Sequence, residues 1–514
     1  MIKFSFVLLS TAFLLSCNTP TKKEEPIQEK YKPTWESLQH FKVPKWFQDA
    51  KLGYWVHWGV YSVPAFKGKH AAEWYGRWMY SKEGQSSRDN QGLPTHLHHI
   101  AKYGDPHKFG YKDFIPMFKA EKFNADQWAD LAVRGGAKYF TMMATHHDCF
   151  CMWDTKLTKW NSVNMGPHKD LVGAIEKAVR ARGLKFGVSN HSAWNPVFFE
   201  WNHINKYDAV DPAYKDLYGT PIIRPGADTI RIKPGETRAS WIPRSRGAVI
   251  PSKRDIQRWY DRTIELCDMY KPDLYYFDWG FRPKEYEKGR QGFGAHYYNK
   301  AIEWGKGTYG DPNVVLNYKG PSYATGSAVL DHEHGGEKTI RKVAWQTDDN
   351  IYAANNWGYD PTVPIKKPNT IIDELIDIVS KNGNLMLSFA PKADGTFPEN
   401  QIQLAYRIGD WMKICGQAIY ATRPWKVSGE ECGNTSVRYT RSKDYKTIYA
   451  IFLTWNEKTL LLKSFADSPA IDSITLMGSN EKINWKKTTK GLQLTLPKDK
   501  PTYDYAYPLV IKLK

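Results

Sequence analysis

The stretch "AKYFTMMATHHDCFCMWDT", residues 137–155, is an apolar run that turns abruptly polar at two adjacent histidines. Short apolar runs of this kind are typical of buried strands of a parallel sheet. The pattern recurs in "KLGYWVHWGV" (51–60), "LKFGVSNHS" (184–192), "PDLYYFDWG" (272–280), "PNVVLNYKG" (312–320), "SAVLDHEHG" (327–335) and "GNLMLSFAP" (383–391). Almost every run ends in His, Asp, Glu, Asn or Lys.

Stretches with helical periodicity lie between these runs. In "FNADQWADLAVRGG" (123–136), Asn124 is placed to cap a helix that two glycines end. The apolar residues Trp128, Leu131 and Ala132 fall on one face of that helix. The same periodicity recurs in "DLVGAIEKAVRARG" (170–183) and "TIIDELIDIVSKNG" (370–383).

Repeated alternation of strand and helix predicts an α/β fold, an irregular (β/α)8-like TIM barrel over residues 34–425. In such a barrel the chemistry lies at the carboxyl ends of the strands, where the polar residues gather. From 426 to 514 the chain changes to short alternating strands separated by turn residues. This segment predicts a C-terminal antiparallel β-sandwich.

The first residues, "MIKFSFVLLSTAFLLSC", combine Lys3 with an apolar run too short to span a bilayer. The ending resembles a bacterial lipobox, so residues 1–17 are expected to be a lipoprotein signal peptide with Cys17 lipidated. The alternative is a plain signal peptide that happens to end in cysteine. Residues 18–33 are polar and predict a flexible tether. We therefore expect a secreted, lipid-anchored protein at the periplasm or cell surface of a Gram-negative bacterium.

The formal charge of +18 and the aromatic content of 14% constrain the partners. Tryptophan and tyrosine faces suit sugars, although large enzymes also use them in ordinary cores. A basic surface attracts polyanions, yet the chain has no recognisable nucleic-acid motif, so no nucleic-acid partner is expected. Residues 205–258 read as an enlarged loop, with nine Lys/Arg against three acids between Arg224 and Arg258. The loop could hold the sulfates of an anionic glycan or be only a solvated surface.

Several motifs together carry a family resemblance: "WFQDAKLGYWVHWGVYSVPAF", "EWYGRWMY", "KYFTMMATHHDCFCMWDTKLTKWNS", "DLVGAIEKAVRARGLKFGV", "PDLYYFDWG", "WQTDDNI", "NNWGY", "VSKNGNLMLSFAPKADGT" and "AIYATRPW". With them the chain resembles glycoside hydrolase family 29, the retaining α-L-fucosidases, over nearly all of its length after the tether. The resemblance implies a barrel followed by a β-sandwich and an exo-acting double displacement without a cofactor. That mechanism uses two carboxyl groups about 5–5.5 Å apart.

The same resemblance implies the catalytic pair. The family nucleophile ends the strand that matches "PDLYYFDWG", which is Asp278 here. The acid/base position is less fixed across the family, and the spacing to "WQTDDNI" favours Glu333 in "LDHEHGG". Glu337, four residues further on, is the alternative.

Residues that match the sugar-binding positions of the family are His57, Trp58, Glu73, Trp74, His146 and His147. Neutral imidazole can both donate and accept, which suits hydroxyl groups. The chain departs from the family at Asn190 and His191, where fucosidases commonly have two tyrosines. It also has Lys319 where an arginine is common, and lysine lacks the bidentate fork.

These departures leave an α-L-galactosidase, or another exo-glycosidase on the same scaffold, as an alternative function. A non-catalytic surface glycan-binding lipoprotein is the second alternative. Zinc at "HHDCFC" is not expected, because adjacent histidines point apart and no fourth ligand is evident. Cys149 and Cys151 are too close for an easy disulfide, and pairing among Cys267, Cys415 and Cys432 stays open. The sequence leaves the oligomeric state open.

Overall fold

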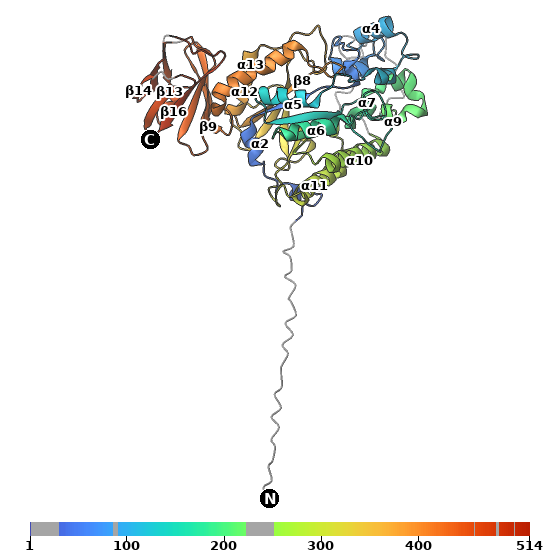
Figure 1. Ribbon diagram of the computed structural model, residues 1–514, viewed down its shortest axis with the longest axis horizontal. Coiled ribbons are helices and arrows are strands. Elements are labelled where there is room, and N and C mark those ends of the chain that lie inside the picture. The colour runs from blue at the N-terminus through green and yellow to red at the C-terminus, as the bar shows by residue number, and fades with distance from the viewer. Residues whose placement is uncertain (2–29, 86–90, 223–250, 457, 480–482, 498) are drawn as a thin grey trace, which may run out of the picture.

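The structure, a computed structural model, describes residues 1, 30–85, 91–222, 251–456, 458–479, 483–497 and 499–514. Eight parallel strands close a barrel in chain order (Figure 1). They are β1 (Leu52–Val56), β2 (Tyr139–Thr145), β3 (Lys185–Asn190), β4 (Leu274–Phe277), β5 (Val315–Lys319), β6 (Val329–Glu333), β7 (Trp345–Asn350) and β8 (Gly383–Phe389). The predicted (β/α)8-like barrel is confirmed.

Seven of these strands match the apolar runs of the sequence, and β7 is the exception. Its sequence, "WQTDDN", is polar after the first residue, yet every residue is buried. Because alternate side chains of a barrel strand face the interior, Gln346 and Asp348 point inward, to Asp331 and Lys319, whereas Asp349 binds Lys366 on the outer side. Apolar patterning could not have identified this strand.

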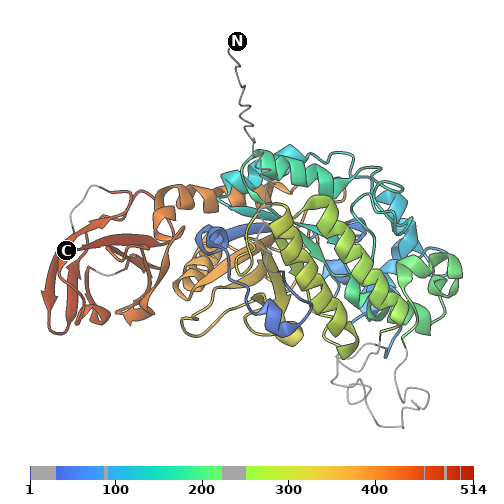
Figure 2. The ribbon, with the colours of Figure 1, turned by 90° about the horizontal axis from the view of Figure 1, so that it is seen from below.

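Helices cover the outside of the barrel. The longer ones are α4 (Leu93–Tyr103), α5 (Ala125–Arg134), α6 (Leu171–Ala181), α10 (Lys253–Tyr270), α11 (Glu287–Glu303), α12 (Pro368–Ser380) and α13 (Glu399–Cys415). Asn124 caps α5 as predicted, its side-chain oxygen accepting the Gln127 N–H at 3.1 Å. Figure 2 shows α10 and α11, in yellow-green, packed side by side over one flank of the barrel.

Shorter helices either precede β1 or lie in the connections that follow the carboxyl ends of the strands. They are α1 (Trp35–Leu38), α2 (Lys45–Ala50), α3 (Tyr75–Trp78), α7 (Asn195–Phe198), α8 (Glu200–Ile204) and α9 (Lys215–Tyr218). A 3₁₀ turn, η2 (Ala72–Trp74), precedes α3, and two more, η5 (Asp208–Val210) and η6 (Pro212–Tyr214), follow α8.

The C-terminal part forms two antiparallel sheets beside α12 and α13 (Figure 1). One has the order β13-β16-β11-β10-β9 and the other β12-β15-β14. The strands are β9 (Arg423–Cys432), β10 (Thr435–Arg441), β11 (Thr447–Phe452), β12 (Thr459–Leu462), β13 (Ile471–Leu476), β14 (Asn484–Thr488), β15 (Gly491–Thr495) and β16 (Tyr507–Leu513). This sheet region begins at Arg423, slightly ahead of the expected residue 426, because β9 already pairs with β10 there.

Two expected segment boundaries need correction. Within the expected tether of residues 18–33, Tyr31 is buried and donates its backbone N–H to Asn299 at 2.8 Å, so the folded part includes Tyr31. The expected loop of 205–258 contains η5, η6 and α9, and its last residues from Lys253 onward belong to α10. Cys17 and residues 223–250 of that basic segment lie outside the described residues.

Cys149, Cys151, Cys267 and Cys415 are buried free thiols. Cys267 and Cys415, two of the three cysteines whose pairing the sequence left open, are therefore not joined to each other. Within the described ranges, no helix combines the length and the apolar character that crossing a bilayer requires.

Candidate functional site

Four histidines meet at the carboxyl ends of the first three strands. His57 follows β1, His146 and His147 follow β2, and His191 follows β3; each is at most 4% exposed. The centroid of the His146 ring lies 4.4 Å from the centroid of the His147 ring and 5.4 Å from that of the His191 ring. His57 lies 6.1 Å from both His146 and His191. The structure thus brings these four residues, all predicted to bind the sugar, to one place.

Neighbouring groups hold the imidazoles in fixed orientations. His57 Nδ1 lies 2.7 Å from Ser388 Oγ, and His147 Nδ1 donates to the His191 carbonyl at 2.8 Å. Burial lowers the pKa of His147 to about 4, and it lowers the pKa of the other three histidines well below the usual value. At neutral pH each ring is therefore uncharged and has one donor and one acceptor nitrogen.

Asp278 follows β4 and points at this group of histidines. Its Oδ2 lies 3.4 Å from His191 Nδ1 and 3.6 Å from His147 Nε2. Its Oδ1 lies 3.3 Å from Lys319 Nζ at the end of β5. Burial raises the pKa of Asp278 to about 7; the Lys319 charge opposes the shift, and the charge of Glu333 adds to it.

Lys319 bridges three carboxylates. Besides Asp278, its Nζ lies 3.3 Å from Glu333 Oε2 and donates to Asp348 Oδ2 at 3.0 Å. Since Asp278 Oδ1 and Glu333 Oε2 are each 3.3 Å from one nitrogen, these two oxygens lie no further apart than twice 3.3 Å. The lysine thus draws the ends of β4, β6 and β7 together.

Glu333 and its alternative, Glu337, occupy different environments. The Glu333 side chain is 36% exposed and reaches Lys319. Glu337 accepts hydrogen bonds from Arg341 and, at 3.0 Å, from His332. Burial raises the pKa of Glu337, but these two bonds outweigh it and hold the pKa below its usual value. A carboxylate held ionised in this way is poorly suited to act as an acid.

Glu73 lies on η2 and is 1% exposed. Its Oε2 accepts the backbone N–H groups of Trp357 and Gly358 at 3.0 and 2.8 Å. Its Oε1 is buried and has no hydrogen-bond partner among the described residues. Burial raises the pKa of Glu73 to about 7, against the two backbone hydrogen bonds. The free oxygen offers a contact to a ligand hydroxyl.

Tryptophan rings lie around the site histidines and Asp278. The Trp74 ring lies 5.6 Å from His147 and is stacked 5.8 Å from Trp279. Trp194 packs edge-on against Trp279 at 4.7 Å, and Trp357 lies 4.9 Å from His57. The predicted Trp74 therefore lies at the site. The sequence does not predict the contributions of Trp194 and Trp357, although the motif "NNWGY" contains Trp357.

Two predicted sugar-binding residues lie elsewhere, which corrects the sequence interpretation. Trp58 is fully buried, donates its indole N–H to the Lys392 carbonyl at 2.8 Å and packs 4.9 Å from Trp128 of α5. Asn190 donates to Thr263 of α10 at 3.0 Å and accepts the Ser192 N–H at 3.0 Å. Successive side chains at a strand end point to opposite sides, so the inward positions of His57 and His191 turn Trp58 and Asn190 outward.

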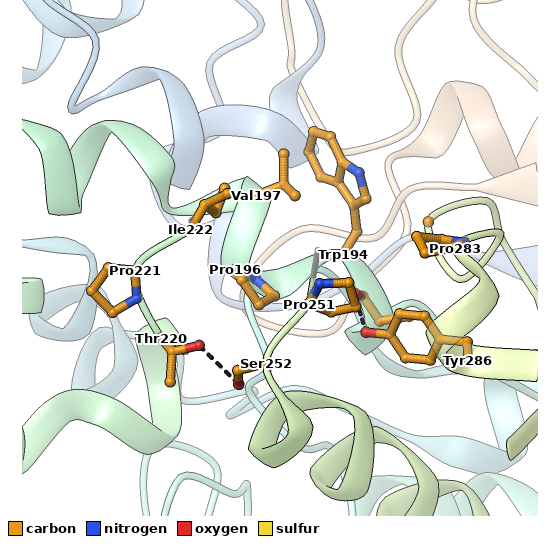
Figure 3. A pocket seen from close by; sticks show the side chains of 12 residues that line it. Trp194, Pro196, Val197, Thr220, Pro221, Ile222, Pro251, Ser252, Pro283 and Tyr286 are labelled. Atoms are coloured by element: carbon orange, nitrogen blue, oxygen red, sulfur yellow. Dashed lines mark hydrogen bonds between the residues drawn. The ribbon is translucent and has the colours of Figure 1, made fainter. Parts of the chain in front are cut away.

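A small pocket adjoins the site at Trp194 (Figure 3). Trp194, Gly280, Pro283 and Tyr286 are among its lining residues. The Tyr286 hydroxyl already donates to the Ala193 carbonyl at 3.0 Å. The walls that these residues present are therefore mainly apolar.

The imidazoles of His146, His147 and His191 each have a ring nitrogen within 4.8 Å of the other two, which is close enough to hold a metal ion. The thiols of Cys149 and Cys151, which zinc favours, are not part of this group. The His147 Nδ1 is also committed to a backbone carbonyl. The arrangement is suited to hydroxyl groups, and the expectation of no metal stays a prediction.

Comparison with known proteins extends over both parts of the chain. The family model "Alpha-L-fucosidase" matches residues 19–417, and "Alpha-L-fucosidase C-terminal domain" matches residues 430–514. The tissue α-L-fucosidase of Rattus norvegicus is 30% identical over 486 residues, which are 92% of this chain and 89% of that protein.

Solved structures give the same result. The crystal structure of Thermotoga maritima α-fucosidase has a TM-score of 0.73 at 30% identity and covers 94% of this chain and 100% of that one. A crystal structure of the T. maritima enzyme in complex with fucose gives a TM-score of 0.73 at 29% identity, with the same coverage. The similarity includes both the barrel and the C-terminal sheets.

Proposed function

Because the chain belongs to the α-L-fucosidase family of glycoside hydrolases, we propose that it removes terminal α-L-fucose from fucosylated glycans by a retaining double displacement. The observation that carries this proposal is the pair of carboxylates held by Lys319, no further apart than twice 3.3 Å. Retaining enzymes need about 5–5.5 Å between the two carboxyl groups and inverting enzymes roughly 6.5–9.5 Å, so this bound on two carboxylate oxygens admits the retaining spacing and only the lower end of the inverting range. Proton NMR of the first product formed from an aryl α-L-fucoside tests it: α-L-fucose is expected, and β-L-fucose would contradict retention.

Asp278 is the proposed nucleophile. Its carboxylate attacks the anomeric carbon, the bond to the leaving oxygen breaks, and the sugar is held as an ester on Asp278. Glu333 gives its proton to the leaving oxygen, then takes one from the water that attacks the ester. Water releases the sugar and restores both carboxyl groups. The burial of Asp278 and the greater exposure of Glu333 support this division.

The neutral histidines and Glu73 are the proposed contacts to the sugar hydroxyls. His146 Nδ1 and Glu73 Oε1 are buried without hydrogen-bond partners among the described residues, so a bound hydroxyl would satisfy them. Leaving such groups unpaired costs about 1–3 kcal/mol each. His146→Ala is therefore expected to raise KM and to lower kcat/KM on aryl fucosides, with little change in thermal unfolding.

Glu333→Gln and Glu337→Gln form a matched pair that tests the acid/base assignment. Glu333→Gln should retain turnover of aryl fucosides with good leaving groups and lose it on poor leaving groups. Added azide should speed turnover only on the good leaving groups, because it attacks the fucosyl-enzyme and replaces neither the missing acid nor the first step. Glu337→Gln should stay close to wild type on both substrates. The opposite pattern would transfer the role to Glu337.

The sugar is the next point to test, because Lys319 replaces the arginine usual in the family. Rates on aryl α-L-fucoside and aryl α-L-galactoside, which differ by one hydroxyl group, separate the proposal from its nearest alternative. We expect kcat/KM to be higher on the fucoside. A higher value on the galactoside would favour the α-L-galactosidase, and no turnover of either by folded protein would favour a binding protein.

We further propose that the protein is lipid-anchored through Cys17 at the periplasm or cell surface, as the N-terminal sequence suggests. Cys17→Ser is expected to move the protein from the membrane fraction to the soluble fraction. Sulfated glycans are a proposed substrate class because of the +18 charge. Activity on them should fall more steeply with salt than activity on a neutral aryl fucoside. Equal salt profiles would contradict that part.

A further inference from the structure

Besides the proposed catalytic pair, the barrel contains two carboxyl groups near Lys319, Asp331 on β6 and Asp348 on β7. Lys319 is level with Asp331 in the sheet, and Glu333 is level with Asp348. Asp331 is 2% exposed and Asp348 is fully buried. Asp348 accepts from Lys319 Nζ at 3.0 Å, the shortest of the three carboxylate contacts of the ammonium. The double displacement does not use either aspartate.

Asp331 is embedded among hydrogen-bond donors and a second acid. Gln346 donates to its Oδ1 at 2.8 Å, and the Tyr276 hydroxyl donates to its Oδ2 at 3.3 Å. Its carboxyl group is also within hydrogen-bond reach of Asp348. Burial first, and then the adjacent Asp348 charge, raise the pKa of Asp331 well above its usual value. Two buried carboxylates in contact do not both ionise, so one proton is shared between them.

We propose that Asp348, hydrogen-bonded by a protonated Asp331, is a positioning residue that holds Lys319 midway between Asp278 and Glu333. The proposal rests on the proposed function of that site. Burial alone would lower the pKa of Lys319, but Asp348, Glu333 and Asp278 together raise it well above the usual value, so the amine stays charged. Asp348 draws this charge away from Asp278. Without Asp348, the ammonium would bind the nucleophile more tightly and make it less reactive.

Other titratable groups also face Asp278, and they define what the variants must change. They are His147 after β2, His191 after β3, Tyr276 on β4, Lys319 on β5 and Glu333 on β6. The histidines are held neutral by burial. Changing Asp348 therefore removes one charge near Asp278, and of these contacts it alters that of Lys319.

The test is the pH profile of kcat/KM on an aryl α-L-fucoside for wild type, Asp348→Asn and Asp331→Asn. Asp348→Asn removes a negative charge that raises the pKa of Asp278, so its acid limb should move to lower pH, by about one unit. Its kcat at the optimum should fall by roughly tenfold. Asp331→Asn replaces a neutral donor with a neutral donor, so its acid limb should stay in place and its kcat should fall less. Asp410→Asn on the exposed surface of α13 is the matched control.

An unmoved acid limb in Asp348→Asn, or a shift to higher pH, would overturn the proposal. So would a shift in Asp331→Asn as large as that in Asp348→Asn. The infrared difference spectrum of wild type minus Asp331→Asn at pH 8 should contain the band of a protonated carboxylic acid, and its absence would refute the shared proton. This measurement needs no turnover, so inactive wild type would count against the proposed function while the spectrum still decides the aspartate pair.

Discussion

At the scale of single residues, the direction of each side chain decides which of two neighbours reaches the site. His57 and Trp58 follow β1, yet only His57 enters the barrel, while Trp58 packs against α5. Asn190 and His191 divide in the same way between α10 and Asp278. After β1 and β3, a motif matched letter by letter assigns both neighbours to the sugar, whereas strand alternation assigns one. After β2 both neighbours, His146 and His147, reach the site.

Lys319 carries the first prediction at this scale. Lys319→Met removes the positive charge that lowers the pKa of Asp278. The nucleophile must be ionised, so activity is lost as pH falls through its pKa of about 7 in wild type. In the variant that loss should begin at higher pH, opposite to Asp348→Asn. The pH profile of kcat/KM measures it, with Lys122→Met, in an exposed ion pair with Asp394, as control.

A shift of the Lys319→Met acid limb to lower pH would contradict this assignment. An unchanged acid limb would mean that the Lys319 charge does not act on the group whose ionisation the profile reports. Either result would require a different nucleophile or a different lysine contact.

At the scale of elements, the sequence predicted those parts of the barrel that apolar patterning and caps define. β2 is a continuous apolar run that ends at polar residues, and α5 is apolar on a helical period between a capping Asn124 and a glycine. The sequence does not predict β7, because the strand is buried on both faces although its residues "QTDD" are polar, and polar residues are usually exposed. Asp348 was missed with it, since no rule for core residues predicts a buried carboxylate paired with a lysine on another strand.

The loop after β4 gives a prediction for a whole element. Gly280 has φ +116°, and a Cβ there would lie 2.8 Å from Trp194 Cδ1. Gly280→Ala should therefore displace the loop that carries Asp278 and reduce kcat/KM on an aryl fucoside by about tenfold or more. Gly326→Ala is the control, because Gly326 has φ +87° but nothing within 4 Å of its Cβ position. Equal losses in both variants would show that backbone strain alone is responsible.

At the scale of the whole molecule, barrel and C-terminal sheets are joined by specific contacts. Arg438 of β10 donates to Asp377 of α12 at 2.8 Å, and Trp411 of α13 donates to the Ala506 carbonyl at 2.8 Å. The sequence predicted both parts, because near residue 426 it changes from alternating strands and helices to short strands separated by turn residues. It could not predict the contacts, because they join residues far apart in the chain.

Stability against pH is the prediction for the whole molecule. Folding raises the pKa of Asp278 to about 7, so between its usual pKa and 7 the folded state holds more protons than the unfolded state. The contribution of Asp278 to the free energy of unfolding is therefore present at low pH and lost as pH rises through 7. Asp278→Asn cannot ionise, so it should be more stable than wild type at pH 8, by roughly 1–3 kcal/mol.

Denaturant unfolding of both proteins at pH 8 and pH 5 measures this difference, with Asp410→Asn as control. The gain in Asp278→Asn should shrink at pH 5. A variant that is less stable than wild type at pH 8 would show that the Asp278 carboxylate stabilises the fold, contrary to the electrostatics of the site.

The most direct test of a retaining α-L-fucosidase with Asp278 as its nucleophile is turnover of an aryl α-L-fucoside by protein beginning at residue 18, compared with Asp278→Ala. We expect wild type to cleave the substrate and the variant to be inactive, because the nucleophile is gone. Added azide should restore cleavage in the variant and yield the inverted fucosyl azide, since a small anion then enters from the side that Asp278 occupied. Full activity of folded Asp278→Ala without azide would show that Asp278 is not the nucleophile.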